Sequence, residues 1–307
     1  MLPGMPAKSK RKPRVAIVGA GNLASALAVA LRQAGYAVGA IISRKGRASL
    51  QRARRLAQET GAVAAMGGHG TRNVNADVVW FCVPDAAIAS AARDFLRATD
   101  WKAADWKTKI ALHSSGALTS DELAVLREQG AAVASVHPLM TFVRGSRPSL
   151  AGVPFAIEGD AAAKRLARAI VKDIGGRANP IRKEDKTAYH AWGTFASPLL
   201  TALLVTCEQV AAAAGVKRKE ARQRMLPMIK QTLANYAVSE AQGIFSGPII
   251  RGDADTVRGH LQTLRRMPIA QEVYVSLSRA ALAYLPGKNK KALEKELRLS
   301  LRGGKRH

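Results

Sequence analysis

The chain has 307 residues, of which 48% are hydrophobic and 23% are charged. These proportions are typical of a folded globular protein and exclude a disordered or collagen-like chain. Lysine and arginine outnumber aspartate and glutamate by 48 to 22, which gives a formal net charge of +26 at pH 7. Such a charge favours polyanionic partners, from nucleic acid to the phosphates of a cofactor, without selecting one of them.

The length predicts two domains, because one domain usually takes about 150 residues. The two cysteines, Cys82 and Cys207, are too few for a disulfide framework or a structural zinc site, so we expect a cytoplasmic setting and no bound metal. No segment offers roughly 20 apolar residues for a membrane span. The nearest candidate, Tyr189–Val205, contains His190 and several hydroxyls, and we interpret it as a buried helix.

The first half of the chain alternates short apolar segments with segments of helical periodicity. Strands that are apolar almost throughout belong to parallel sheets covered on both faces, and their alternation with helices predicts a doubly wound α/β domain of the Rossmann type over residues 14–183. Strands are expected at Arg14–Gly19, Ala37–Ser43, Asp77–Val83, Lys109–His113, Ala131–His137, Val153–Ile157 and Ala178–Ile181. Helices are expected at Asn22–Ala34, Arg47–Thr60, Asp85–Ala98, Thr119–Glu128 and Ala161–Ile174.

After about residue 183 the strand signal disappears, and the spacing predicts an all-α domain over residues 184–300. Pro198, Pro227 and Pro268 are expected to kink or start helices. Residues 1–13 are expected to form a disordered basic tail, and residues 301–307 a second basic tail. The helices of this half are expected at Lys186–Gly215, Lys217–Ala241, Asp253–Arg266, Ile269–Leu285 and Lys288–Leu301.

A G-x-G-x-x-A motif over residues 19–24 follows the first expected strand and opens the first helix. The first glycine permits a tight turn, the second lets the backbone approach a pyrophosphate, and Ala24 permits close packing of the helix on the strand. The helix N-terminus adds N–H donors and a favourable dipole. Because both flanking elements are present, the motif indicates a dinucleotide-binding loop rather than a purely structural turn. Its residues are Gly19, Ala20, Gly21, Asn22 and Leu23.

The end of the second strand bears on which nucleotide is bound. An NAD site usually places Asp or Glu there, bonded to the ribose 2′-hydroxyl. This chain instead reads Ser43-Arg44-Lys45-Gly46-Arg47 and has no acid before Glu59. Hydroxyl and guanidinium groups suit a 2′-phosphate, which arginine can bind through two hydrogen bonds. We therefore expect NADP(H) rather than NAD(H) at Ser43, Arg44 and Arg47, with a solvated basic loop as the alternative.

Polar residues also follow later strands at their carboxyl ends, where open α/β sheets bind ligands. Val83-Pro84-Asp85 ends one strand, His113-Ser114-Ser115-Gly116 the next, and His137-Pro138 the one after. Two histidines at the same edge point to proton exchange as readily as to structural roles.

A polar stripe runs along the otherwise apolar helix after Lys186. His190, Thr194, Ser197 and Thr201 fall at i, i+4, i+7 and i+11, on one face of an α-helix. Hydroxyls in such positions often bond back to the preceding turn of their own helix. The other interpretation places this face against a nicotinamide, with His190 able to exchange a proton.

The most distinctive segment is Ser246–Asp253, which reads Ser-Gly-Pro-Ile-Ile-Arg-Gly-Asp. Gly-Pro and Gly252 predict a tight approach of the backbone, and Asp253 can cap the helix that begins there. Asp253 can also pair with Arg251 or His260. A structural loop explains all of these residues without any catalytic role.

Together these motifs resemble a group of bacterial proteins in which a Rossmann-like domain is followed by a domain of unknown function, DUF2520. The resemblance runs from about Arg14 to Leu285. More distantly, the chain is similar to pyrroline-5-carboxylate reductase, ketopantoate reductase and F420-dependent NADP reductase. The resemblance implies an all-α domain similar to the C-terminal domain of 6-phosphogluconate dehydrogenase. It also implies a homodimer formed through that domain. It also implies NADP(H) contacts near Val83, Pro84, Ser115 and Gly116.

One position departs from the pattern of this group. Its members read Ala-Ser-Asn in the first long helix, whereas this chain has Ala196-Ser197-Pro198. The related hydroxyacid dehydrogenases carry a catalytic lysine and an asparagine on that helix; neither occurs here in that register, and Lys186 lies a turn before Tyr189. Proline removes a backbone donor together with the amide side chain. Either His190 and Ser197 carry the proton chemistry, or catalysis has been lost.

The leading hypothesis is an NADP(H)-dependent oxidoreductase of a small, acidic carbonyl, imine or hydroxyacid, with His190 and His137 as proton donors and Ser115 bonded to the reacting oxygen. The alternative is a non-catalytic NADP(H)-binding sensor or scaffold. Specific nucleic-acid binding is disfavoured, because the sequence carries no recognition motif and aromatic residues make up only 5%. The expected partners are a small-molecule substrate and a second copy of the chain, without a membrane.

Overall fold

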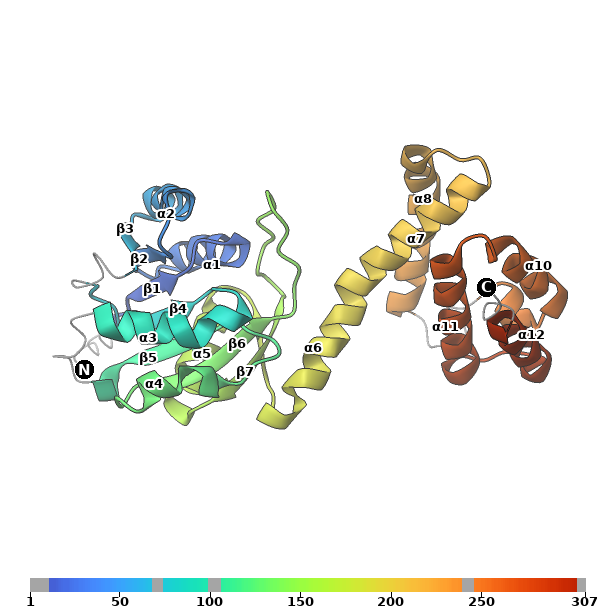
Figure 1. Ribbon diagram of the computed structural model, residues 1–307. Coiled ribbons are helices and arrows are strands. Elements are labelled where there is room, and N and C mark those ends of the chain that lie inside the picture. Colours follow the sequence, from blue (N-terminus) through green and yellow to red (C-terminus); the bar gives the residue numbers. More distant parts are fainter. Residues whose placement is uncertain (1–10, 68–73, 99–105, 239–245, 303–307) are drawn as a thin grey trace, which may run out of the picture. The chain divides into compact units, whose positions relative to one another are not determined.

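The structure is a computed structural model that describes residues 11–67, 74–98, 106–238 and 246–302 (Figure 1). The chain divides into two compact units, Met1–Thr194 and Phe195–His307. The division falls within a long helical segment. We describe each unit by itself.

The first unit is built on an eight-stranded sheet with the order β3-β2-β1-β4-β5-β6-β7-β8. Neighbours from β3 through β6 pair in parallel, β7 is antiparallel to β6, and β8 is parallel to β7. The strands are β1 Val15–Val18, β2 Val38–Ser43, β3 Val63–Met66, β4 Val78–Phe81, β5 Ile110–His113, β6 Ala132–Pro138, β7 Pro154–Gly159 and β8 Arg177–Pro180. All seven expected strands are confirmed to within two residues at either end, whereas β3 was not expected.

Helices cover both faces of this sheet, as expected for a doubly wound domain. Because side chains alternate along a strand, Val15 and Ile17 of β1 enter one apolar core while Ala16 and Val18 enter the other. The first core includes α1 (Asn22–Gln33), α2 (Arg47–Thr60) and α5 (Ala161–Asp173), and the second includes α3 (Ile88–Ala98) and α4 (Ala124–Arg127), which Figure 1 shows on one face. The Rossmann-type α/β architecture is confirmed.

The second unit is helical throughout its described part, as expected. Its helices are α7 Leu200–Ala213, α8 Arg218–Val238, the short α9 Pro248–Arg251, α10 Ala254–Leu264, α11 Pro268–Tyr284 and α12 Lys290–Arg302. Val257, Leu261, Val275 and Leu297 belong to its core. A buried carboxylate, Glu208 of α7, accepts hydrogen bonds from two arginines at the start of α8, Arg218 (2.6 Å) and Arg222 (2.8 Å), and so fastens the α7–α8 hairpin.

Helix α6 (Lys186–Thr194) continues into α7 through a π-helical turn, Phe195–Leu199, that contains Pro198. Proline has no N–H to donate to the preceding turn, so the regular α-helical ladder is interrupted there. The polar stripe expected along this helix is therefore not one regular face. Thr194 Oγ1 donates to the carbonyl of His190, and Thr201 Oγ1 to that of Ser197, both at 3.0 Å. The hydroxyls of these threonines bond back to their own helix.

Two expectations about this region are wrong. The helical segment Lys183–Ala213 has a mean hydropathy of 1.4 over an 18-residue window, and by length and composition it could cross a membrane. Only 6% of that window is buried, so Tyr189–Val205 is not the buried helix that we expected.

The basic N-terminal tail is held to the first unit from at least Lys12 onward. Lys12 Nζ lies 2.6 Å from Asp173 Oδ2, donates to the carbonyl of Ala34 at 2.7 Å, and lies 4.6 Å from the centre of the Tyr36 ring. Residues 1–10 and 303–307, where most of the two expected tails fall, lie outside the described residues, and α12 extends to Arg302.

Candidate functional site

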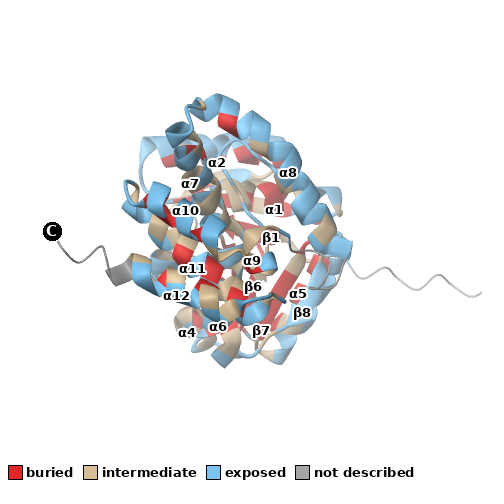
Figure 2. Cartoon of the chain, turned by 90° about the vertical axis from the view of Figure 1, so that its right-hand side faces the viewer, coloured by how far each residue is buried: buried red, intermediate tan, exposed pale blue. Residues whose placement is uncertain are grey.

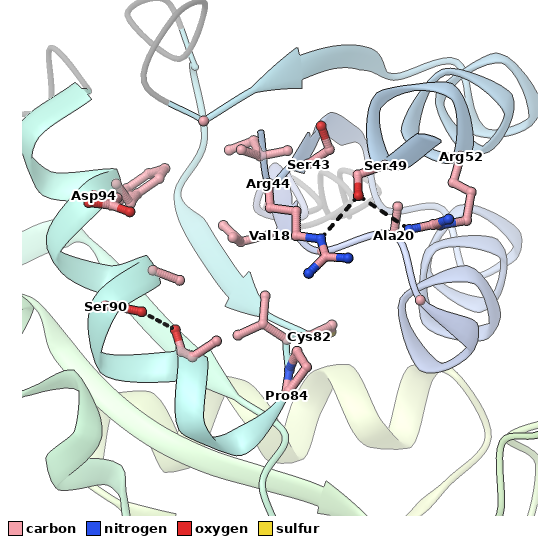
Figure 3. A pocket seen from close by; sticks show the side chains of 18 of the residues that line it. Val18, Ala20, Ser43, Arg44, Ser49, Arg52, Cys82, Pro84, Ser90 and Asp94 are labelled. Carbon is pink, nitrogen blue, oxygen red and sulfur yellow. Dashed lines mark hydrogen bonds between the residues drawn. The ribbon is translucent and has the colours of Figure 1, made fainter. Parts of the chain in front are cut away.

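A cleft of about 420 Å³ opens at the carboxyl ends of β1, β2 and β4, where the glycine motif was expected to bind a dinucleotide (Figure 3). Gly19 has φ +115°, and a Cβ there would lie 2.2 Å from the carbonyl oxygen of Cys82, so the fold itself requires glycine. Gly21 precedes α1, and a Cβ there would meet no atom within 4 Å. The loop is therefore tight at Gly19 and open at Gly21, which leaves room for a ligand at the helix N-terminus.

The other candidate cofactor residues divide into two groups. Ala20, Ser43, Arg44, Val83 and Pro84 line the cleft together with both glycines. Five candidates do not line it: Asn22, Leu23, Arg47, Ser115 and Gly116.

Among these, Asn22 is engaged elsewhere, because its Nδ2 donates to the carbonyl of Phe142 at 3.1 Å. Arg47 is exposed at the start of α2. The sequence analysis missed two residues of α2 that do line the cleft, Ser49 and Arg52. Their signal was the helical spacing, since i and i+3 share one face of a helix.

A second group of residues gathers at the ends of β5 and β6 and the start of α6. A Cβ on Gly116 would lie 2.7 Å from Cδ2 of His190 and 2.8 Å from Nε2 of His137, so the two candidate histidines meet over this glycine. Their ring centres are 6.2 Å apart. Nδ1 of His137 bonds the carbonyl of Ser114 at 2.9 Å. Nδ1 must be protonated to donate to a carbonyl, so Nε2 of neutral His137 carries the free lone pair.

Ser115 joins this cluster to the end of β4. Its Oγ donates to Asp85 Oδ2 at 2.7 Å and accepts from the N–H of Leu118 at 2.9 Å. The hydroxyl proton of Ser115 is thus committed to Asp85. In this geometry Ser115 holds the loop after β5, and it would have to exchange its partner to bond a reacting oxygen.

His113 is fully buried and structural. Its Nδ1 accepts the N–H of Ser115 at 3.1 Å, which leaves Nε2 protonated to donate to the carbonyl of Thr119 at 3.0 Å. Desolvation, helped by the nearby charge of Lys186, lowers the pKa of His113 to about 4. Desolvation also lowers the pKa of His137. The His113 ring is therefore neutral at pH 7, and the shift of His137 favours its neutral form.

Lys186 is the residue of this cluster that the sequence analysis passed over. Its side chain is 1% exposed. Nζ donates to Ser135 Oγ at 2.6 Å and to the carbonyl of Ser115 at 3.0 Å, so it ties the start of α6 to β6 and to the loop after β5. Desolvation lowers its pKa to about 8, although Glu158 and Asp85 oppose the shift. The signal was present in the sequence, because Lys186 and His190 stand at i and i+4.

Ser197 lies in the second unit, in the π-helical turn, and its catalytic role stays a prediction.

The Ser246–Asp253 segment has a structural role. Asp253 caps α10 by accepting from the N–H (3.1 Å) and the hydroxyl (2.7 Å) of Thr256, whereas His260 bonds Tyr274 instead. A Cβ on Gly252 would lie 2.6 Å from the carbonyl of Lys288, which explains this glycine. Within the described part of the chain, no group of three His, Cys, Asp or Glu side chains is placed to hold a metal ion.

Comparison with known proteins gives the family context. A Rossmann-like domain model matches residues 5–138, and the domain of unknown function DUF2520 matches residues 153–281. No curated protein matches the chain.

Several solved structures share its fold. A candidate NADP oxidoreductase from Bacteroides fragilis is 22% identical, with 88% of this chain and 98% of that chain covered and a TM-score of 0.70. A reductive aminase from Aspergillus terreus in complex with NADPH is 12% identical, with 92% of this chain and 99% of that chain covered and a TM-score of 0.62. A pyrroline-5-carboxylate reductase from Coxiella burnetii is 15% identical, with 95% of this chain and 98% of that chain covered and a TM-score of 0.55. By its two domain matches, the chain belongs to the proteins in which a Rossmann-like domain is followed by a DUF2520 domain.

Proposed function

We propose that the chain is an NADP(H)-dependent oxidoreductase that acts on a small carbonyl, imine or hydroxyacid. One observation carries this proposal. The open turn at Gly21 lines a cleft that is also lined by Arg44 and by Ser43, whose side chain is buried. Within the described part of the chain, Oγ of Ser43 has no hydrogen-bond partner. A buried hydroxyl without a partner is costly unless a ligand bonds it.

The chemistry of the donors also fits NADP(H). N–H groups at the start of α1 suit a pyrophosphate, and a guanidinium in place of the usual acid suits a phosphate on the ribose. Solved relatives with this fold include an NADPH complex of a reductive aminase. When bound, NADP(H) supplies or accepts a hydride, and the protein must move the accompanying proton.

We assign that proton to the histidine pair over Gly116. Nε2 of neutral His137 is free to accept a proton, and its lowered pKa makes the ring a ready donor once it is protonated. His190 is exposed beside it. Lys186 donates hydrogen bonds to Ser115 and Ser135, and because it begins α6 these bonds also position His190 on that helix. The positive charge of the protein favours an acidic substrate.

Two measurements test the proposal. In calorimetry at fixed salt, NADPH should bind at least tenfold more tightly than NADH, a difference of about 1.4 kcal/mol. With a panel of small carbonyls and imines, His137→Ala should slow NADPH oxidation roughly 100-fold, whereas His260→Ala in the second unit should not change it. Equal affinity for the two cofactors would show that Arg44 does not select NADPH over NADH. Tight NADPH binding without turnover would favour the sensor or scaffold, and no binding would refute the cofactor itself.

We also propose that the second unit forms a homodimer. Large apolar side chains are exposed along α7, α8 and α11, and Figure 2 shows α8 exposed over almost its whole length. Exposed large apolar side chains on several helices of one unit support an interface there. Examples are Val210, Met228, Leu233 and Leu277. Light scattering should give twice the chain mass for the native protein and a monomer for Leu233→Glu; a native monomer would refute the dimer.

A further inference from the structure

The basic end of the cleft contains two arginines that converge on one hydroxyl. Arg44 Nε donates to Ser49 Oγ at 3.2 Å, and an Nη of Arg52 donates to the same oxygen at 3.3 Å. Figure 3 shows the two guanidinium groups reaching this oxygen from different elements, Arg44 from the loop after β2 and Arg52 from α2. Because Ser49 Oγ already accepts two hydrogen bonds, its own proton is left to donate to a further acceptor.

The electrostatics of this end are those of an anion site. Among the described residues, neither Arg44 nor Arg52 has a carboxylate partner within 4 Å. Helix α2 begins here with no acidic residue in its first turn and no side-chain cap, so its first N–H groups are unpaired within the helix. The carboxylate in the cleft, Asp94 of α3, lies on the opposite side in Figure 3.

An independent observation also points to a ligand. The Ser43 side chain is 2% exposed and lines the same cleft, and within the described residues its hydroxyl has no partner. Three hydrogen-bonding side chains beside Ser43 are thus directed at one region, and they carry two positive charges.

We propose that Ser49 and Arg52 complete, with Ser43 and Arg44, a binding site for a phosphate monoester. The inference rests on the proposed function, because the phosphate would be the one on the ribose of NADP(H). Arg47 is not part of the site. On an α-helix Arg52 lies about 60° from Ser49, whereas Arg47 lies about 160° away, on the opposite face.

The test compares two nucleotides that differ by one phosphate, adenosine 2′,5′-bisphosphate and adenosine 5′-monophosphate. Calorimetry on the full chain gives the ratio of their affinities, which isolates the contribution of the 2′-phosphate. Arg52→Ala should lower this ratio roughly tenfold, the size expected for losing one charge-assisted hydrogen bond. Ser49→Ala should lower it as well. Arg47→Ala removes the same charge from the same helix and should change the ratio less than about twofold.

The outcomes separate this inference from the proposed function. A similar loss for Arg52→Ala and Arg47→Ala would mean a general effect of charge and would overturn the site. A ratio of one for the native protein would also overturn the site, although the protein would then still bind the adenosine part of the nucleotide. If neither nucleotide binds, the proposed function fails as well. Inorganic phosphate serves as a further probe: binding as tight as that of the bisphosphate would show a free-phosphate site and overturn the assignment to the ribose.

Discussion

The buried His113 predicts how the stability of the first unit depends on pH. The unfolded chain protonates this histidine below its ordinary pKa of 6.5, whereas the folded chain does so only near the lowered pKa of about 4. The folded state is therefore fully favoured above pH 6.5, and it loses stability as the pH falls from 6.5 to 4. At 1.36 kcal/mol per pKa unit the complete effect is about 3 kcal/mol, of which about 2 kcal/mol is already lost at pH 5.

The effect can be isolated by a substitution that does not titrate. Asparagine at position 113 keeps an acceptor for the Ser115 N–H but carries no charge at any of these pH values. All four tryptophans precede residue 195, so tryptophan fluorescence follows urea unfolding of the first unit alone. Between pH 7.5 and pH 5 the native protein should lose about 2 kcal/mol more than His113→Asn.

The matched control is His260→Asn, which removes an exposed histidine from the second unit and should leave the pH dependence of the first unit unchanged. If His113→Asn loses as much stability on acidification as the native protein, the ring is not held neutral by its surroundings and the reasoning is refuted.

Three further substitutions follow from the geometry. Gly19→Ala should destabilise the first unit severely, because its Cβ has no space beside Cys82. Gly21→Ala should unfold at the same urea concentration as the native protein and yet bind NADPH more weakly. Equal urea midpoints for the two variants would contradict this prediction. Gly116→Ala must push the histidine rings apart by several tenths of an ångström and should slow any turnover roughly tenfold without loss of NADPH binding. Asp253→Ala removes the cap of α10 and should lower the thermal midpoint of the second unit, followed by circular dichroism, by a few degrees; an unchanged midpoint would show that the cap is dispensable.

The sheet was predictable because most of its strands are buried on both faces and read as continuous apolar runs. Two strands lie at the sheet edges and are not buried on both faces. β8 was expected although all four of its residues are exposed, whereas β3, which also has four residues and carries an exposed Val63, was not expected. The break in the helix at Pro198 was also predictable in kind. Its form as a π-helical turn was not, because proline only removes a donor and the rest of the helix determines how the backbone adjusts.

The candidate site was predictable in its elements and less so in its members. Arg47 was expected at the site because it closely follows the end of β2, but the phase of α2 turns Arg52 toward the cleft instead. Lys186 was passed over because a buried lysine can be recognised only with its partners, and those lie on β6 and in the loop after β5, about 50 and 70 residues earlier in the chain.

The two domain families of this chain do not divide where its folding units divide. The DUF2520 match begins at residue 153, so β7, α5 and β8 share its sequence family although they complete the sheet of the first unit. Without β7, the edge of β6 would present unpaired N–H and C=O groups from Ala134 to Pro138. An exchange of genetic modules at this family boundary would cut through one hydrogen-bonded sheet and leave His137 on its exposed margin. A Rossmann-like part and a DUF2520 part that are newly combined must therefore still be able to form the pairing of β6 with β7.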